Sequence, residues 1–223
     1  MSALALLQLV SPALPVGAFS YSEGLEVLIQ AGLLTDEASL EDWLTAELER
    51  GALRLEAAAL SLLRADLQLW TRLGDQAALN RVLDLDGWLL STREAVEMRA
   101  QQLQMGGSLL QLMADMDHGL PHPAKLAWPG AWAWAALVLA VSETEMVEGY
   151  LYGWTANQLS AAVRLVPLGP TRAQVLQQRL LPRIAEQARL LQEQDPRQLW
   201  SGGVGASLAQ LAHAELYSRL FRS

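Results

Sequence analysis

The sequence predicts an all-α protein, and three observations support this fold class. The 223 residues are dominated by Leu, Ala, Gln, Glu and Arg, which form helices readily, whereas Val and Ile are scarce. No stretch alternates apolar and polar residues as a half-buried strand does. Capping residues, glycines and prolines separate segments of helical periodicity. We therefore expect one domain, residues 1–223, built as a single bundle of about 8–10 helices.

The first predicted helix spans residues 21–31. Ser20 and Glu23 have the spacing of a capping box at its start, and Gly32 supplies a left-handed stop at its end.

The second predicted helix begins near Thr35 or Ser39, where acidic residues complement the positive end of the helix dipole. Its buried face carries apolar residues at helical spacing, namely Leu40, Trp43, Leu44, Leu48, Leu55 and Ala59. Gly51 interrupts this face without necessarily breaking the helix. A third helix is expected over residues 65–83.

A second capping box, Ser91 with Glu94, is expected to open a helix over residues 92–116. The next segment is expected to be a loop, because it contains Gly119, Pro121 and Pro123. Helices over residues 131–141 and 144–163 come next.

Residues 166–170 form a predicted turn, after which Thr171 and Gln174 cap a helix over residues 172–194. Pro182 should kink or break this helix. The glycine-rich residues 195–205 are expected to be a flexible connection to a short amphipathic helix, so that residues 202–223 form a flexible docking tail. The apolar residues of that helix are Leu208, Leu211, Leu216, Leu220 and Phe221.

Composition narrows the possible functions. Hydrophobic residues make up 52% of the chain, which excludes disorder, and only 18% of residues are charged. The net charge of −8 argues against nucleic acid or an anionic membrane as the main partner, since both attract Lys and Arg. The absence of cysteine excludes disulfides, thiolate metal sites and cysteine nucleophiles.

No export signal or membrane span is expected. Residues 1–10 lack a basic region and a clear cleavage site. The longest apolar run, residues 126–141, contains Pro129 and Gly130 and is shorter than the roughly 20 residues of a membrane span. The cytoplasm is therefore the expected location.

Motifs for catalysis are missing from the sequence. Its only lysine, Lys125, is not part of a P-loop, and the G-x-S-x-G nucleophile motif is absent. His118 and His122 have the i, i+4 spacing of a helical metal site, but Gly119 and Pro121 lie between them. We therefore read them as a solvated loop, with a weak metal contact as the alternative.

Two more features point to protein contacts. Trp132 and Trp134 are two positions apart and cannot face the same core, so one of them should be exposed at an interface. His213 has no nominated nucleophile beside it, so a structural or interface role is expected.

Three segments resemble the urease accessory protein UreF family over essentially the whole chain. They are LVSPALPVGAFSYSEGLE at residues 9–26, EGYLYGW at residues 148–154 with the polar and turn residues up to Thr171, and YSRLFRS at residues 217–223. The resemblance implies an all-α protein that acts as a homodimer and has no enzymatic activity. It implies assembly with UreD (also called UreH), the GTPase UreG and the urease apoprotein. The complex, rather than a tightly bound cofactor of this chain, would handle nickel during assembly of the urease metallocentre.

The same segments supply the candidate site residues. The candidates for partner binding are Tyr21, Ser22, Glu26, Tyr150, Trp154, Asn157, Gln158, Arg164, His213, Tyr217, Arg219, Leu220, Phe221 and Arg222. The candidates for a structural role, in turns, close approaches or helix entry, are Pro12, Pro15, Gly17, Ser20, Gly24, Gly149, Gly153, Pro167 and Gly169. No catalytic residue is nominated.

Two alternatives remain open at this stage. Within the accessory role, the chain could regulate the GTPase by contributing an arginine in trans. Outside it, the chain could be an enzyme or a small-ligand-binding protein built around a helical-bundle cavity.

Overall fold

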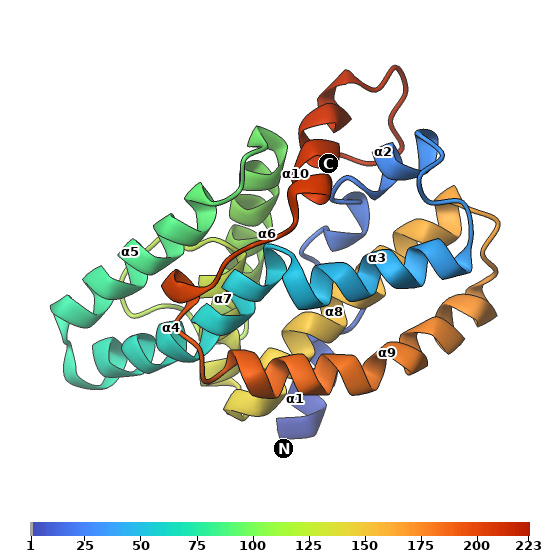
Figure 1. Ribbon diagram of the computed structural model, residues 1–223. Coiled ribbons are helices and arrows are strands. Elements are labelled where there is room, and N and C mark those ends of the chain that lie inside the picture. The colour runs from blue at the N-terminus through green and yellow to red at the C-terminus, as the bar shows by residue number, and fades with distance from the viewer. Residues whose placement is uncertain (1) are drawn as a thin grey trace.

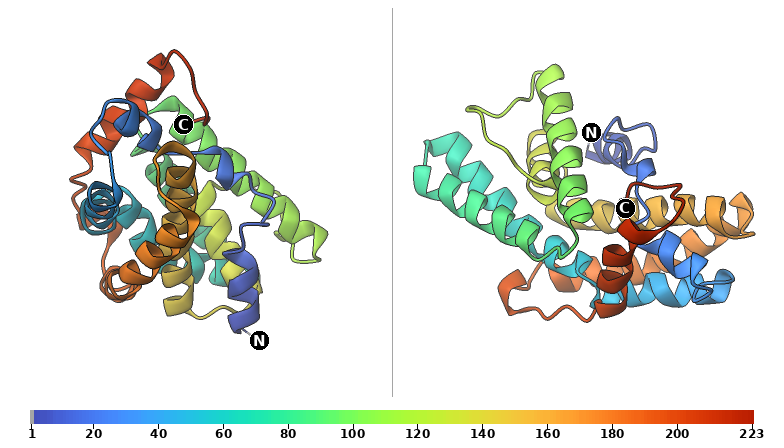
Figure 2. Two further views of the ribbon diagram at one scale, coloured as in Figure 1. Left: turned by 90° about the vertical axis from the view of Figure 1, so that its right-hand side faces the viewer. Right: turned by 90° about the horizontal axis from the view of Figure 1, so that it is seen from above.

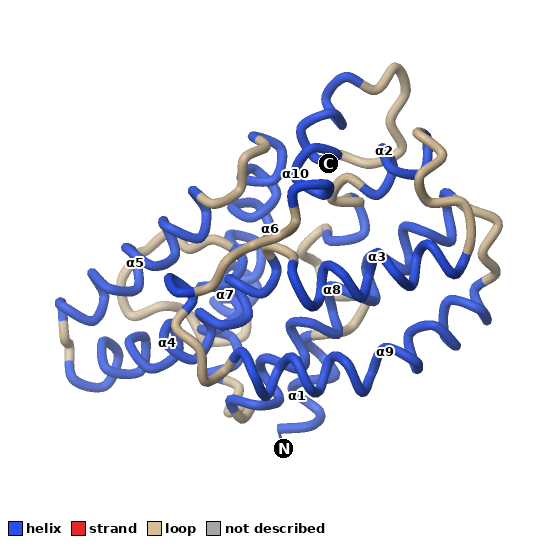
Figure 3. Tube along the Cα trace, in the orientation of Figure 1, coloured by secondary structure: helices blue, strands red, loops and turns tan. Residues whose placement is uncertain are grey.

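The computed structural model describes residues 2–223, so residue 1 of the predicted domain lies outside the described residues. Within the described range the chain forms ten α-helices and three short 3₁₀ helices, and no strand is present (Figure 3). The all-α prediction is confirmed.

The helices follow one another with short connections. The first five are α1 (Ser2–Leu9), α2 (Leu25–Gln30), α3 (Glu37–Arg50), α4 (Leu53–Leu73) and α5 (Gln76–Ser91). The second five are α6 (Val96–Asp115), α7 (Trp128–Val138), α8 (Glu143–Leu165), α9 (Pro170–Leu191) and α10 (Val204–Ala212). The 3₁₀ helices are η1 (Ala18–Ser20), η2 (Pro196–Gln198) and η3 (His213–Glu215).

Helix α4 lies at the centre of the bundle and packs against α3, α5, α7, α8 and α9. Its apolar side chains are buried along most of its length. Helices α4 and α5 form an antiparallel pair on one side, and α8, α9 and α3 form the other side (Figures 1 and 2). Helix α10 packs against α2, which brings the C-terminal end of the chain beside the N-terminal motif.

The predicted start of the helix over residues 21–31 is wrong. Ser20 lies in η1, and α2 begins only at Leu25, with Gly24 as its N-cap. The reason is that Glu23 adopts a left-handed conformation (φ 53°) and Gly24 does so too (φ 90°), which interrupts the helix. Gly32, with φ 70°, follows α2 as the predicted left-handed stop.

Two glycines break helices that the sequence analysis had joined. The chain is extended at Gly51, so the predicted apolar face from Leu40 to Ala59 is divided between α3 and α4. Gly74 (φ 66°) ends α4, and the Asp75 side chain then accepts hydrogen bonds from two backbone N–H groups to begin α5. The predicted helix over residues 65–83 is therefore two helices.

Two further capping boxes were assigned to the wrong residues. Ser91 is the last residue of α5, and α6 begins at Val96 after Ala95. Thr171 lies inside α9, whose N-cap is Gly169 and whose first residue is Pro170. Helix α9 continues through Pro182, so the alternative of a break is wrong.

The prediction that Trp132 or Trp134 is exposed is also wrong. Both side chains are buried, because α7 is enclosed by α4, α6 and α8. Their indole N–H groups donate to the backbone carbonyls of Met146 (3.0 Å) and His118 (2.9 Å), so each buried polar atom has an acceptor.

Within residues 2–223, every helix is too short or too polar to cross a membrane.

Candidate functional site

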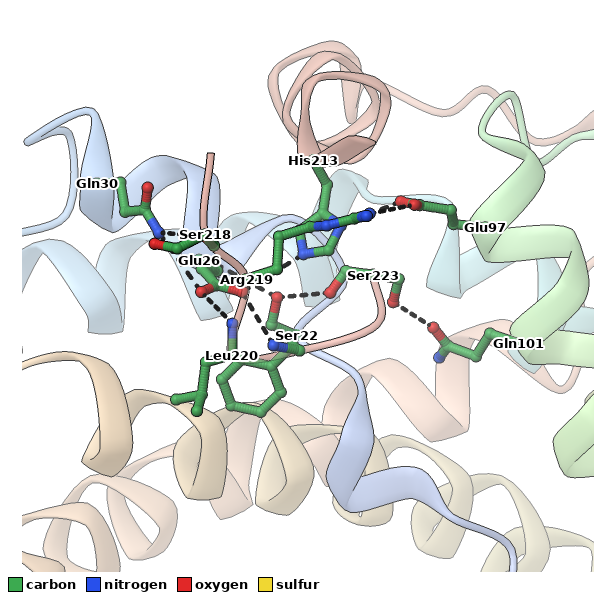
Figure 4. Close-up of polar contacts among 11 residues, drawn as sticks. Ser22, Glu26, Gln30, Glu97, Gln101, His213, Ser218, Arg219, Leu220 and Ser223 are labelled. Atoms are coloured by element: carbon green, nitrogen blue, oxygen red, sulfur yellow. Dashed lines mark hydrogen bonds and ion pairs between the residues drawn. The ribbon is translucent and has the colours of Figure 1, made fainter. Parts of the chain in front are cut away.

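The final residues of the chain, 213–223, are named here the C-terminal segment. They lie against α2 and the loop before it, as Figure 4 shows. The predicted terminal helix is shorter than expected, because helical structure ends at Glu215 and the rest is irregular. The backbone groups of this irregular part bond to α2 and its preceding loop instead of to a helix of their own.

Glu26, on α2, is the main anchor of the C-terminal segment. Its buried carboxylate accepts hydrogen bonds from the backbone N–H groups of Leu220 (2.8 Å) and Phe221 (3.1 Å). A carboxylate that accepts from two backbone donors forms charge-assisted bonds, which are stronger than neutral ones. Glu26 therefore fixes the register of the segment.

Ser22 and Glu23 hold the last residue. The carbonyl oxygen of Ser223 accepts from the backbone N–H of Ser22 (2.9 Å), from that of Glu23 (3.1 Å) and from the Ser22 hydroxyl (2.6 Å). The Ser223 hydroxyl donates to Oε1 of Gln101 on α6 (2.7 Å). Two successive backbone N–H groups therefore converge on one acceptor.

His213 connects the C-terminal segment to two helices. Its fully buried ring places Nδ1 3.0 Å from a carboxylate oxygen of Glu97 on α6 and Nε2 3.4 Å from one of Glu26. Both partners are acceptors, so both nitrogens donate when the ring carries two protons. Arg219 also donates to Glu97 (2.9 Å), which makes Glu97 a second anchor.

Phe221 inserts its ring into the core, beneath the side chain of Arg164 on α8. The guanidinium carbon of Arg164 lies 4.5 Å from the ring centre, a cation–π geometry, and Nη1 donates to the carbonyl oxygen of Phe19 (3.2 Å). Arg164 thus links α8, the N-terminal motif and the C-terminal segment.

The opposite face of this region is open to solvent. Tyr217 is fully exposed and Leu220 is 53% exposed, while Arg222 is exposed and contacts the body through its backbone N–H. Helix α10 also presents Val204, Leu208 and Leu211 at i, i+4 and i+7, which is one helix face. We name Tyr217, Leu220 and these three residues the outer strip. Mobility of residues 202–223 stays a prediction.

A buried polar cluster lies behind the docked segment. Glu56 on α4 accepts hydrogen bonds from the guanidinium of Arg93 (2.9 and 2.5 Å), from Gln102 (3.2 Å) and from the hydroxyl of Tyr150 (2.7 Å). Burial tends to lower the pKa of Arg93, but the nearby carboxylates outweigh it and raise that pKa. Tyr150 therefore bonds to a residue of its own chain.

The side chain of Glu23, in the same region, bonds to two helices. Its two carboxylate oxygens accept from Gln101 (2.6 Å) and from the indole N–H of Trp154 (2.9 Å). Burial raises the pKa of Glu23, and the nearby Arg93 opposes this shift. Glu23 thus joins α6 and α8 through its side chain and the C-terminal segment through its backbone.

A cavity of about 370 Å³ adjoins the cluster. It is bounded by the N-terminal loop and by α4, α6, α7 and α8, and its lining includes Tyr21, Asn157 and Gln158. The hydroxyl of Tyr21 donates to Gln104 on α6. Gly153 also lines the cavity, and among the described residues no atom from outside its own stretch of helix lies within 4 Å of where its Cβ would be. The predicted close helix approach at Gly153 is therefore wrong.

The other structural candidates lie at a close helix approach or in turns. A Cβ on Gly149 would lie 2.5 Å from Leu6, so its absence lets α1 approach α8. Gly17 has φ 76°, which permits the turn between the proline-containing loop of Pro12 and Pro15 and η1. Pro167 and Gly169 lie in the turn between α8 and α9.

Of the two loop histidines, the candidates for a weak metal contact, His122 lies beside an aromatic side chain. His118 and His122 lie between α6 and α7, and the His122 ring contacts Trp70 at 6.4 Å between ring centres. In the described part of the chain, no group of three potential metal-ligating side chains is found.

Sequence reasoning missed several residues of the site, namely Glu23, Glu56, Arg93, Glu97 and Gln101. Their only signal in the sequence is that polar side chains occupy helix positions or helix entries flanked by apolar residues. That pattern cannot identify hydrogen-bond or ion-pair partners that lie far apart in the chain.

The fold and site define an all-helical protein in which the C-terminal segment docks on α2 and the loop before it, near a buried ionic cluster. Comparisons with known proteins place it more narrowly. The UreF family model matches residues 34–181. The chain is 41% identical over 223 residues to the urease accessory protein UreF of Microcystis aeruginosa (strain NIES-843 / IAM M-2473), covering 99% of this chain and 97% of the relative. It is 40% identical over 221 residues to the protein of that name from Prochlorococcus marinus (strain MIT 9215), covering 96% of each. The chain belongs to the UreF family of urease accessory proteins.

Proposed function

We propose that the chain is a non-enzymatic maturation factor that helps load nickel into apo-urease. The observation that carries the proposal is the relationship to urease accessory proteins UreF over 96% or more of this chain. In this role the chain is a scaffold that binds UreD (UreH), recruits the GTPase UreG and presents the assembly to the urease apoprotein as a homodimer. Nickel is the cargo of that assembly, and the cytoplasm is where it would act.

The outer strip is the proposed contact for UreD. Aromatic and arginine side chains are enriched at protein interfaces, and Tyr217 and Arg222 supply them beside the exposed apolar residues of the strip. The inner face of the same segment is anchored by Glu26 and His213, so the strip is held in one arrangement before the partner arrives. Pre-organisation of this kind reduces the entropy lost on binding.

The proposal is tested by producing urease with its accessory proteins, with and without this chain. Without the chain, we expect urease that assembles but contains little nickel and has little activity. The nickel content of the purified urease is the measurement, and an otherwise identical strain that carries the intact gene is the control. Fully active, nickel-loaded urease in the absence of the chain would contradict the proposal.

A finer question is whether the chain changes GTP hydrolysis by UreG or only positions it. Single-turnover GTP hydrolysis by UreG, measured with and without saturating amounts of this chain and UreD, separates the two. An increase of about 10³-fold or more is expected of an arginine supplied in trans, and an unchanged rate is expected of a passive scaffold.

A further inference from the structure

The ring of His213 lies between two acidic side chains that belong to different helices (Figure 4). Nδ1 is 3.0 Å from a carboxylate oxygen of Glu97 on α6, and Nε2 is 3.4 Å from one of Glu26 on α2. The His213 residue is 0% exposed and Glu26 is 2% exposed, so the ring has no contact with solvent. Whichever ring nitrogen lacks a proton therefore faces a carboxylate oxygen rather than water.

The number of protons on the ring decides whether both contacts are favourable. A neutral imidazole has one N–H donor and one acceptor nitrogen, whereas an ionised carboxylate only accepts. With a neutral ring, one nitrogen donates and the lone pair of the other faces a negatively charged oxygen. With two protons on the ring, both contacts are charge-assisted hydrogen bonds. The observed geometry therefore suits the doubly protonated ring.

The charges around the ring favour the same state. Among the described residues, Arg219 is the only arginine or lysine that forms an ion pair with either carboxylate, and it bonds to the other oxygen of Glu97. Glu26 instead accepts the backbone N–H groups of Leu220 and Phe221. Two carboxylates and one guanidinium leave one negative charge, which a protonated ring cancels.

Other charged groups on the elements around the ring have partners elsewhere or face solvent. Glu94, just before α6, accepts from the hydroxyl of Ser207 on α10 (3.1 Å). The side chain of Glu23, in the loop before α2, bonds to α6 and α8. Glu215 and Arg222, on the C-terminal segment, are exposed. The charged side chains in contact with the ring are thus the two carboxylates.

We propose that Glu26, His213 and Glu97 form a proton-dependent clasp that holds the C-terminal segment on α2 and α6. The docked segment retains one proton that the undocked segment releases as the pH rises, so docking weakens with increasing pH. An imidazole in solvent loses its proton between about pH 5 and 8, and the clasp responds from this range upward. Tyr217 and Leu220 of the outer strip lie on the same segment, so the bound proton also holds them in place. These contacts lie within the chain, and the proposal does not depend on the urease role.

Amide hydrogen exchange of the unmodified full chain is the first test, between about pH 5 and 9, a range that spans the charge change of histidine. The backbone N–H groups of residues 220–222 bond to Glu26 and to the carbonyl oxygen of Ser20. Their protection, corrected for the intrinsic pH dependence of exchange, should fall with pH by up to about tenfold per pH unit, the limit for one linked proton. Protection that stays constant or increases with pH would overturn the proposal.

A matched pair of variants isolates the clasp. Glu97→Gln offers the ring both a donor and an acceptor, so a neutral ring bonds to the new amide and still donates to Glu26. We expect this variant to keep the segment docked and to lose the pH dependence of protection. It also loses the ion pair with Arg219, for which Arg219→Gln is the control, because that change leaves both carboxylates against the ring. The control should retain the pH dependence, and equal pH dependence in the two variants would count against the clasp.

The ring ¹⁵N chemical shifts of His213 give a readout that does not rely on the folding of any variant. While residues 220–222 are protected, both ring nitrogens should have the shifts of protonated nitrogens. As the pH rises, one of the two shifts should change over the same range in which protection is lost. A ring with one unprotonated nitrogen while the segment is still protected would overturn the proposal.

Discussion

The carboxylate of Glu26 binds the backbone N–H of Phe221, a residue 195 positions away in the chain. This contact closes the N-terminal motif onto the C-terminal segment, and His213 and Ser22 complete the closure (Figure 4). Several residues that the sequence analysis expected to face partners therefore face each other. The outer strip is what this closure leaves on the surface.

Glu26→Gln should loosen the C-terminal segment. The variant keeps one oxygen but replaces the other acceptor with an NH₂ group, which leaves a backbone N–H of Leu220 or Phe221 without an acceptor. We expect a loss of about 1–3 kcal/mol in the free energy of unfolding and faster amide exchange at residues 220–223. Glu193→Gln, at an exposed position, is the control. Unchanged exchange in residues 220–223 would contradict the anchoring role.

Arg93→Ala should strongly destabilise the protein. The change leaves the buried carboxylate of Glu56 without its cationic partner, and breaking a buried pair in this way costs about 3–5 kcal/mol. Arg81→Ala removes one partner of the exposed pair with Asp66 and should cost about 0–1 kcal/mol. Urea unfolding of the two variants measures the difference, and similar losses in both would argue against the cluster as a core element.

Ionisation of Asp86 should lower the free energy of unfolding as the pH rises. Burial raises its pKa to about 6, although the backbone N–H groups of Ala127 and Gly130 partly oppose the shift. Between its unfolded pKa of about 4 and this value, the folded state binds more protons than the unfolded state, so raising the pH costs up to about 3 kcal/mol.

Asp86→Asn tests this pH dependence, because it keeps the shape of the side chain and removes the titration. The stability of the original chain relative to the variant should decrease between pH 4 and pH 7, as measured by urea unfolding at each pH. A relative stability that does not change with pH would show that the proton affinity of Asp86 is ordinary.

Gly24→Ala should separate α10 from α2. Gly24 has φ 90°, and an added Cβ would lie 3.0 Å from the backbone nitrogen of Gln210. Gly32→Ala is the matched control, because it has φ 70° and, in the described structure, open space around the added Cβ. The control should lose about 1–2 kcal/mol from backbone strain alone, and Gly24→Ala should lose more. Equal losses would mean that the close contact with α10 is unimportant.

Tyr217→Ala should weaken binding to UreD without affecting the fold. Tyr217 is fully exposed, so the change should alter the free energy of unfolding by less than about 0.5 kcal/mol. Leu33→Ala, another exposed apolar residue outside the outer strip, is the control for binding. Affinity for purified UreD is the measurement, and equal affinity of Tyr217→Ala and the original chain would exclude this residue from the interface.

Local patterns predicted much of the fold. The loop at Gly119, Pro121 and Pro123 and the stop at Gly32 follow from backbone preferences that act within a few residues. Capping boxes were less well predicted, because Ser91 and Thr171 have suitable spacing but lie inside helices. A side chain near a helix start caps it only where the backbone leaves helical geometry, and packing of the neighbouring helices decides that position.

By itself, the sequence determined the all-α class, most loops and the family, because composition, periodicity and motif order are readable along the chain. Only the tertiary structure decided where the polar residues of the motifs point. Glu26 and Phe221 meet because α10 packs on α2, and Glu56 has a buried partner because Arg93 is brought against it. Such pairings depend on the relative placement of helices, and burial makes each one obligatory, since an unpaired charge in the core is costly.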